Sequence, residues 1–345
     1  MAYTTIDKPT DYFNTKLYTG NGSGQSITGV GFSPEFLWLK ERTSTSYHRL
    51  SDIIRGTNKQ LSSNVSDAEE TISTVVSSYD SDGFTVGADN GSNESGQTYV
   101  SWNWLAGGTA SSNSDGSITS SVSANTTAGF SIVSYTGSGS NATVGHGLSS
   151  ALSMIIFKAR GTGNWLVYHQ GIGNTHGIFL NTTSAKDDDA TYFQDTNPTS
   201  SLFSIGTSTL VNDTNPYIAY CFAEKKGYSK FGSYTGNGNA DGTFVYTGFK
   251  PAFFICKRYN DSGYDWLMYD NKRQVSFNVI DDFLKPNLAD AETTGNANQS
   301  LDFLSNGVKH RGNGASSNGS GASYIYMAFA ESPFVNSNGV PNNAR

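Results

Sequence analysis

The feature of the sequence that most constrains the fold is an internal repeat. Each of three copies opens with the turn-rich phrase Tyr-Thr-Gly-Asn-Gly or a close variant, which starts at Tyr18, Tyr135 and Tyr234. Each copy closes with an apolar run, which starts at Tyr99, Tyr217 and Tyr324. The spacing within a copy is 81, 82 and 90 residues. The period of 117 and then 99 residues exceeds the roughly 20–50 residues of solenoid repeats, so we predict three domains, each with its own core.

Two more features recur at matched places between the opening and closing phrases. The first is an apolar stretch that follows a Gly and a Pro or Ser turn and ends in Lys and Arg, at Gly31–Arg42, Gly147–Arg160 and Gly248–Arg258. The second follows further along each copy, at His48–Asp52, Trp165–His169 and Trp266–Asp270. Four features in one order at matched spacing are not explained by composition, so the chain is a threefold repeat.

The residue types predict an all-β fold. The 345 residues include 38 Gly, 19 Tyr and 20 Phe; aromatic residues suit a pleated surface and Gly suits turns. Runs such as Glu35–Glu41 are too short for core helices, and Phe130–Thr136 alternates like a half-buried strand. Several short strands per copy predict three tandem β-sandwich domains of jelly-roll type. The only predicted helices are short, at Ser66–Glu70 and Asp281–Leu284.

The repeat divides the chain into six segments. They are an N-terminal arm at 1–15, sandwich copy 1 at 16–107, a linker at 108–127, copy 2 at 128–226, copy 3 at 227–333 and a C-terminal tail at 334–345. The linker is rich in Ser and Gly, which predicts a flexible surface segment. The arm and the tail are expected to be flexible unless they dock, and docking on a neighbouring subunit is one use for them.

Charge and cysteine content exclude several classes of partner. The formal net charge is −7 and the basic residues are scattered, which argues against a nucleic-acid partner. No apolar run approaches the ~20 residues that span a bilayer, and the N-terminus does not have the pattern of a secretory signal, so no membrane partner is expected. Cys221 and Cys256 each lie in an apolar run and are interpreted as small buried side chains.

Motifs for metal or phosphate binding are missing from the sequence. No GxGxxG, phosphate loop or G-x-S-x-G elbow occurs. None of the five histidines forms an HExxH or HxxxH pair, and His169 and His176 are seven residues apart in a Gly-rich loop. The acidic stretches Asp187–Asp189 and Asp80–Gly83 lack the spacing of a calcium loop, so solvated turns are the favoured interpretation. We predict no cofactor and no metal site.

A glycosidase needs two carboxylates that face each other across a cleft. Glu69 and Glu70 are neighbours and would point to opposite faces of a strand, whereas Glu94, Glu224 and Glu331 stand alone near turns. The sequence therefore predicts no catalytic residue, and the protein is not expected to be an enzyme.

Aromatic residues and one lysine also recur at matched places. Trp165 and Trp266 are each followed three residues later by tyrosine, Tyr168 and Tyr269. Exposed rings of this kind would stack on sugars, but a role in the sandwich core is the favoured interpretation. Function is expected instead in the loops that differ between copies, such as Arg55–Val75 and Asp290–Ser323.

The repeated lysines are Lys40, Lys158 and Lys257. Each ends an apolar strand, so it either extends along the sheet edge, where it discourages aggregation, or pairs with an aspartate such as Asp52 or Asp270. Copy 2 has His169 at the matched aspartate position, which weakens the second alternative. In both cases the role is interpreted as structural.

The phrases "GFSPEFLWLKER", "YIYMAFAESPF" and the closing "GVPNNAR" resemble a repeat family of structural proteins from tailed bacteriophages, many of them marine or cyanobacterial. The resemblance covers Tyr18 to Arg345, although copy 1 ends in "SWNWLAGG" at Ser101–Gly108 instead of the Phe-Ala-Glu ending. The resemblance implies concanavalin-like jelly rolls in virion appendages, and it brings no catalytic residues.

The leading hypothesis is a virion structural protein, a fibre or surface-decorating subunit used in attachment to the host surface. It would be assembled in the host cytoplasm, contact other virion proteins through its termini, and form a homo-oligomer, with a trimer favoured. The alternative is a glycan-binding module or a polysaccharide hydrolase that acts on host surface carbohydrate. A bacterial adhesin is a third and less favoured class, because no signal or wall anchor is recognised.

Overall fold

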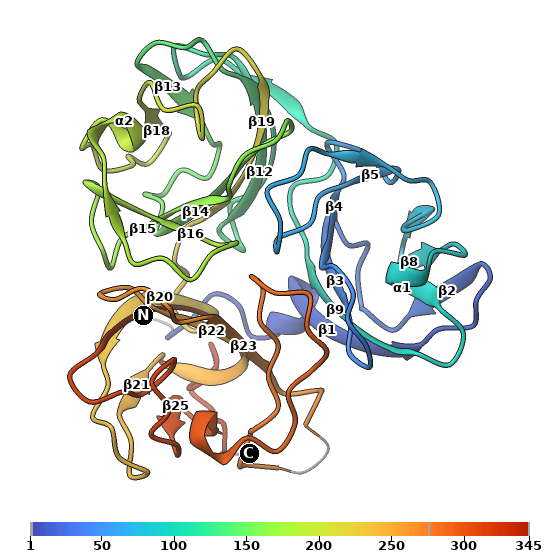
Figure 1. Ribbon diagram of the computed structural model, residues 1–345, viewed down its shortest axis with the longest axis vertical. Helices are drawn as coiled ribbons and strands as arrows, with labels where there is room; N and C mark the ends of the chain where they lie inside the picture. Colours follow the sequence, from blue (N-terminus) through green and yellow to red (C-terminus); the bar gives the residue numbers. More distant parts are fainter. Residues whose placement is uncertain (1–2, 275–276, 344–345) are drawn as a thin grey trace.

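The computed structural model of the chain describes residues 3–274 and 277–343, and it confirms the all-β prediction. Three lobes, one for each copy of the repeat, surround a common centre (Figure 1). Within the described residues, no helix has the length and apolar character needed to cross a membrane.

Each lobe contributes one large antiparallel sheet that faces the centre. In copy 1 the order is β1–β9–β3–β4, formed by Phe13–Thr19, Thr98–Trp104, Phe36–Glu41 and Arg49–Asp52. In copy 3 it is β20–β26–β22–β23, formed by Ser229–Thr235, Ser323–Pro333, Phe249–Arg258 and Trp266–Asp270. The matched strands of copy 2 are β12–β19–β14–β15, formed by Phe130–Thr136, Pro216–Phe222, Met154–Ala159 and Leu166–His169. The opening phrase thus ends the first strand of each copy, and the closing run forms the neighbouring strand.

A smaller sheet packs on the outer face of each large sheet. In copy 1 it is β2–β8–β7, formed by Gln25–Thr28, Gly83–Val86 and Ser78–Asp80. In copy 2 it is β13–β18, formed by Ala142–Gly145 and Leu202–Ile205. In copy 3 it is β21–β25–β24, formed by Phe244–Tyr246, Gly307–His310 and Leu301–Leu304. An outer core lies between the two layers of each copy, around Phe84, Phe157 and Phe303 respectively. One loop of copy 1 adds the two-stranded sheet β5–β6, formed by Lys59–Gln60 and Glu70–Thr71.

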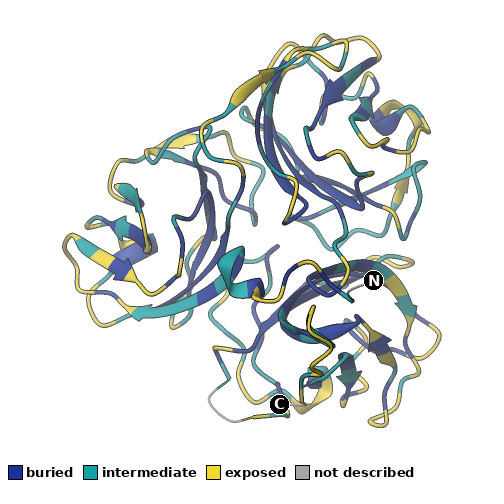
Figure 2. Ribbon diagram, turned by 180° about the vertical axis from the view of Figure 1, so that it is seen from behind, coloured by how far each residue is buried: buried dark blue, intermediate teal, exposed yellow. Residues whose placement is uncertain are grey.

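The inner faces of the three large sheets pack against one another in one central core (Figure 2). Trp104 of copy 1 lies 6.0 Å from Phe253 of copy 3 and 6.5 Å from Phe130 of copy 2, measured between ring centroids. The prediction that each copy has an independent core is therefore wrong in part. Each copy has its own outer core, but the large aromatic side chains of its inner face also pack against the other two copies in the central core.

The large sheets are consequently buried on both faces. Phe130–Thr136, which was expected to be half-buried, forms β12 with buried side chains on both sides. Strands β3 and β14 are buried throughout. Alternation of polar and apolar residues does not predict burial in these strands, because one face of each large sheet contacts the central core and the other face contacts the outer core.

Among the residues that the structure describes, helical structure is limited to single turns. The helices are α1 (Asn90–Asn93), α2 (Ala190–Phe193) and the 3-10 turns η1 (Pro9–Asp11) and η2 (Ala297–Gln299). The two predicted helices are wrong. Ser66–Glu70 is irregular until Glu70 enters β6, and in Asp281–Leu284 the last two residues form isolated β-bridges. The backbone groups of Phe283 and Leu284 bond to Thr293 and Met268 instead of to a helical turn.

The segment 108–127 is a part of the sheet of copy 2 and not an unstructured linker. It contains β10 (Ser111–Asn113) and β11 (Ser120–Asn125), and β11 pairs antiparallel with β12. On the opposite side, β16 (His176–Phe179) and β17 (Asp187–Asp188) complete this 8-stranded sheet. The linker prediction fails because a Ser-rich segment still pairs with a neighbouring strand edge, and Val122 adds an apolar anchor in the outer core.

Both chain ends dock on the same chain. Thr4 Oγ1 donates to the Lys226 carbonyl at 2.9 Å, and the last residues of the arm enter β1. The Ser337 amide of the tail donates to the Asp7 carboxylate at 2.6 Å. The tail is therefore hydrogen-bonded directly to the arm, and the arm is anchored on the body. Both marked ends lie at the lobe of copy 3 (Figure 1), and their docking on a neighbouring subunit stays a prediction.

The opening phrase recurs because it fixes a turn against the closing run. In copy 1 the Tyr18 ring stacks on Tyr99 at 5.0 Å, and the Tyr18 hydroxyl donates to the Ser92 carbonyl at 2.6 Å. The same stacked pairs are Tyr135 with Tyr217 and Tyr234 with Tyr324. Gly20 is required because a Cβ there would lie 2.2 Å from the Glu94 carbonyl oxygen. The motif that opened the sequence analysis is thus structural.

A buried asparagine holds this turn in each copy, at Asn93, Asn212 and Asn318. In copy 3, Asn318 Nδ2 donates to the carbonyls of Asn239 and Gly312, and its Oδ1 accepts from the Asn237 amide. The side chain therefore satisfies several backbone groups at once.

Replacing Asn318 by alanine leaves those backbone groups without partners. We expect Asn318→Ala to lower the free energy of unfolding by about 2 kcal/mol, measured by urea denaturation. The control is Asn141→Ala at an exposed turn, which is expected to change it by less than about 0.5 kcal/mol. Equal effects of the two substitutions would contradict the assigned role.

Candidate functional site

Three junctions between the copies close the body into a ring. At each junction, a ring nitrogen from the repeated segment His48–Asp52, Trp165–His169 or Trp266–Asp270 donates to a backbone carbonyl of another copy. The contacts are Trp165 Nε1 to Ser62 at 2.9 Å, Trp266 Nε1 to Phe179 at 2.9 Å and His48 Nε2 to Lys285 at 3.0 Å. We name these junctions 1–2, 2–3 and 3–1 after the copies that meet there.

Junctions 1–2 and 3–1 each bury an aspartate–arginine pair. At junction 1–2, Asp52 accepts from Arg55 Nε at 2.6 Å and from the Tyr220 hydroxyl of copy 2 at 2.9 Å. At junction 3–1, Asp270 pairs with Arg273 and accepts from Trp102 Nε1 of copy 1 at 3.0 Å. The arginine compensates each buried carboxylate, as burial of a charge requires.

A glutamate extends each pair across its junction. Glu69 binds Arg55 of its own copy and Arg160 of copy 2. Glu292 binds Arg273 of its own copy and Arg42 of copy 1. Two matched networks of alternating charge therefore connect copy 1 to both of its neighbours.

Junction 2–3 uses neutral groups at the matched positions. His169 stands where the other copies have aspartate, and Met327 stands where they have the donors Tyr220 and Trp102. His169 Nε2 donates to the Tyr326 carbonyl at 3.0 Å, and its Nδ1 accepts from the Gly171 amide. The chain thus places a carboxylate only where the facing copy offers a side-chain donor.

Burial of His169 makes the stability of the fold depend on pH. Burial lowers the pKa of His169 to about 4, whereas a histidine in the unfolded chain takes up a proton near 6.5. Between these values the unfolded state binds more protons, so stability falls as the pH falls. We expect His169 to contribute a loss of about 2.4 kcal/mol between pH 7 and pH 4.5.

Urea denaturation of the wild type and of His169→Gln at both pH values checks this. The variant is expected to have the smaller difference in unfolding free energy between the two pH values. An unchanged difference would show that His169 is not the titrating group.

The three repeated lysines are buried, and each ammonium donates to backbone carbonyls near the end of its strand. Lys158 Nζ, for example, lies 2.7 Å from the carbonyl oxygens of Ala159 and Gly161. Burial lowers the pKa of Lys40, Lys158 and Lys257 to about 8. Pairing of these lysines with Asp52 and Asp270 is wrong, because the two carboxylates bind arginine.

The repeated aromatic residues belong to the cores. Trp165, Trp266, Tyr168 and Tyr269 are all buried, so none of them offers a ring to a sugar and the core interpretation is confirmed. Cys221 and Cys256 are buried free thiols, as expected, and burial raises the pKa of Cys256 to about 12.

Of the candidate metal ligands, the structure brings His176 and Asp188 near each other but leaves His169 apart from them. His169 lies at junction 2–3, while His176 Nε2 lies 3.7 Å from an Asp188 carboxylate oxygen. Asp187 accepts from the Tyr192 hydroxyl, and Asp189 caps α2. Within residues 3–274 and 277–343, no group of three or more His, Cys, Asp or Glu could hold a metal ion.

The remaining acidic candidates have local partners. Asp82 of the Asp80–Gly83 stretch accepts from the amides of Gly29 and Gly31. The glutamates Glu224 and Glu331 pair with Lys230 and Lys250, and Glu70 pairs with Arg49.

The threefold repeat breaks at one position beside junction 3–1. Counted back from the tyrosine of the opening phrase, Thr15 matches Ile132 and Phe231, and both of these fill the central core. Thr15 is also buried, but its hydroxyl has no hydrogen-bond partner among the described residues. A hollow of about 320 Å³ opens here, which we call the Thr15 hollow, lined by Asn14, Thr15, Lys16, Leu17, Gly29 and Lys272.

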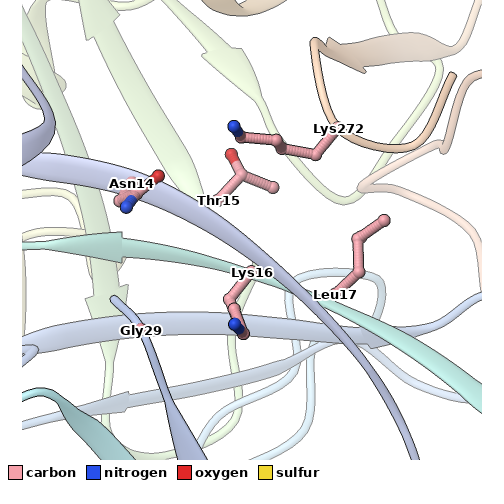
Figure 3. Close-up of a pocket in the computed structure, with 6 residues that line it drawn as sticks. All are labelled: Asn14, Thr15, Lys16, Leu17, Gly29 and Lys272. Carbon is pink, nitrogen blue, oxygen red and sulfur yellow. The ribbon is translucent and has the colours of Figure 1, made fainter. Parts of the chain in front are cut away.

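The Thr15 hollow combines positive charge with groups that form hydrogen bonds (Figure 3). Thr15 and Lys272 lie on one side of β1, and Lys16 lies on the other side beside Gly29. Neither ammonium forms an ion pair with any residue that the structure describes. A ligand with carboxylates would therefore complement this site.

A second hollow of about 470 Å³ lies beside the docked N-terminal arm. Tyr246 is 53% exposed at its rim, and the Tyr3 hydroxyl donates to the Gly248 carbonyl at 2.7 Å. The Lys226 ammonium lies 4.5 Å from the centre of the Tyr3 ring. An exposed tyrosine beside polar groups offers both an apolar face and hydrogen bonds.

Sequence reasoning missed the Thr15 hollow, although a signal for it was present. The loops Arg55–Val75 and Asp290–Ser323, where function was expected, contribute Glu69 and Glu292 to the junctions. Thr15 was assigned to the arm outside the repeat, so it was not compared with Ile132 or Phe231. Extending the alignment of the copies by a few residues shows a polar residue at an otherwise apolar position.

These features define an all-β repeat protein whose three copies form one body around a shared core. The chain belongs to the family described as a domain of unknown function, DUF7483, which matches residues 8–333. The match runs through all three copies, in agreement with the single central core. A search of curated proteins finds no match to the chain.

Proposed function

We propose that the protein is a non-enzymatic structural component of a bacteriophage virion, a fibre or surface-decorating subunit that serves host attachment. The observation that carries the proposal is the ring, in which three junctions and one core tie three lobes into a single body. Such a body suits display on a particle surface, because its loops diverge while its scaffold stays fixed. The resemblance of the repeated phrases to phage structural proteins supports the same function.

Each lobe is proposed to be a concanavalin-like jelly roll. The support is its two-layer arrangement, in which a large inner sheet packs on a smaller outer sheet over a core of its own. The ring also limits how chains can assemble. The inner sheet faces that could join three separate subunits are already buried between the three copies of a single chain. A homotrimer is proposed to form through other surfaces.

Mass spectrometry and cryo-electron microscopy of purified virions test the proposed function. The protein is expected in intact particles at a fixed copy number, with density at the surface. Its absence from washed particles would reject the proposal. The molar mass in solution, measured by light scattering, distinguishes a 36.9 kDa monomer from a trimer.

Glycan binding is the second candidate, and the hollow beside Tyr246 is the observation that favours it. Host-surface oligosaccharides are expected to bind there without being hydrolysed, and Tyr246→Ala is expected to weaken binding about tenfold or more through loss of the exposed ring. Calorimetry measures the binding, and chromatography of the oligosaccharide detects products. Tyr47→Ala, at another exposed aromatic residue, is the matched control. Unchanged affinity in Tyr246→Ala would show that the glycan does not bind at this hollow. Release of shorter oligosaccharides would favour a hydrolase.

A further inference from the structure

We propose that the free edge of β1 in the Thr15 hollow is a docking site for an extended acidic segment of a partner protein, which adds to the sheet of copy 1 as a further strand. This mode of binding uses backbone hydrogen bonds for affinity and side chains for selectivity. The inference does not depend on the proposed virion function.

The direction of the backbone groups in β1 shows which of them face the edge. The Leu105 amide donates to the Tyr12 carbonyl, and the Gly20 amide donates to the Gln97 carbonyl. Residues of even number in β1 therefore bond to β9, and the groups of Thr15 and Leu17 point away from it. The amides and carbonyls of Thr15 and Leu17 have no partner in the described part of the chain.

The matched edges in the other two copies are covered. In copy 2, Ile132 at the position of Thr15 pairs with Ser123 of the added strand β11. In copy 3, the Phe231 carbonyl accepts from Gln170 Nε2 at 2.7 Å, and its amide donates to Glu224 at 3.4 Å. Among the described residues, copy 1 has neither an added strand nor side-chain hydrogen bonds at this edge. Copy 2 thus shows that the edge of the first strand can accept a further strand. The matched edge of β1 in copy 1 is open.

The charges around the edge select the chemistry of the occupant. Lys16 and Lys272 lie on opposite sides of β1, so an added strand would meet an ammonium on each face. An edge lysine also blocks pairing with apolar or basic strands. Carboxylates on the incoming strand would pair with the Lys272 ammonium and would share the Lys16 ammonium with the nearby Asp82 carboxylate. The unpartnered Thr15 hydroxyl gives one further hydrogen bond.

Hydrogen exchange of the free protein tests the first half of the proposal. The amides of Thr15 and Leu17 are expected to exchange rapidly, while those of Lys16 and Tyr18 in the same strand are protected. If Thr15 and Leu17 are already protected in a self-associated form, the occupant is a second copy of the chain and the acidic partner is rejected.

Peptide binding to the full-length protein tests the second half. The probe is a short synthetic peptide in which Glu alternates with Thr and Val, and the matched probe has Lys in place of Glu. Saturable binding of the Glu peptide, with protection of the Thr15 and Leu17 amides, is expected. Failure of this peptide to bind, or equal binding of the Lys peptide, would overturn the proposal.

Two substitutions at Thr15 distinguish the contribution of its backbone amide to peptide binding from that of its side-chain hydroxyl. Thr15→Pro removes an amide that faces the free edge but leaves the pairing of β1 with β9 intact, because an edge strand tolerates proline at such a position. The substitution is expected to lower the affinity for the Glu peptide about tenfold. Thr15→Val keeps the amide and nearly the same shape, so it is expected to retain most of the affinity. Circular dichroism and the Tm establish that both variants are folded. If Thr15→Pro is folded and binds like the wild type, strand addition is wrong.

Discussion

A polypeptide that contains only residues 108–226, copy 2 with its two added strands, is expected not to fold. Its inner face carries Phe130, Trp165 and Phe222, which in the intact chain are buried in the central core. Exposing side chains of this size costs about 1.5–3 kcal/mol each, and more of them line the same face. The sum exceeds the ~5–15 kcal/mol that stabilises a typical domain. Circular dichroism and urea denaturation of the fragment are the measurements.

The control for this experiment is the full-length chain with a protease site inserted between Ser114 and Asp115, in an exposed turn. Cut after folding, it is expected to remain a complex with one unfolding transition, because the central core holds the copies together. A fragment that unfolds cooperatively with the stability of the whole chain would contradict the shared core and support independent domains.

The second large effect is expected from Asp270→Ala at junction 3–1. The substitution leaves Arg273 buried with Glu292 as its remaining carboxylate partner, and it removes the acceptor of Trp102 Nε1. Breaking one partner of a buried pair costs about 3–5 kcal/mol, which urea denaturation at pH 7 measures. Asp261→Ala is the matched control, because Asp261 also lies three residues from its arginine, Arg258, but in an exposed position; about 0–1 kcal/mol is expected there.

The pH dependence of the same variant gives an independent check. The Arg273 charge and hydrogen bonds hold the pKa of Asp270 below its usual value. The contribution of Asp270 is therefore present above the pKa of the unfolded chain and is lost as the pH falls through the folded value. The difference between wild type and Asp270→Ala is expected to shrink in acid. A difference that stays constant would point to lost packing instead of lost charge.

The sequence by itself was sufficient for the all-β class and for the repeated apolar strands, although it missed the strands β10 and β11. Apolar runs between turn residues predicted β3 and β12 closely, since a short run bounded by Gly, Pro or Ser has few other conformations available. The threefold repeat followed from matched spacing, the buried role of Cys221 followed from its apolar surroundings, and the buried role of Trp165 followed from its repetition at Trp266. These are local properties of the chain.

Only the tertiary structure decided how the copies associate and where the pattern fails. An apolar sheet face looks the same in sequence whether its own copy or another copy covers it, so the central core was not predicted. Arg55 and Arg273 lie three residues after Asp52 and Asp270 in the same copy. The donors Tyr220 and Trp102, which bind the same carboxylates, lie in other copies, and spacing along the chain carries no information about them. The polar residue at Thr15 is visible in the sequence, but the open strand edge beside it shows only when the three strand edges are compared in space, because an unpaired backbone group leaves no trace in the sequence of residues.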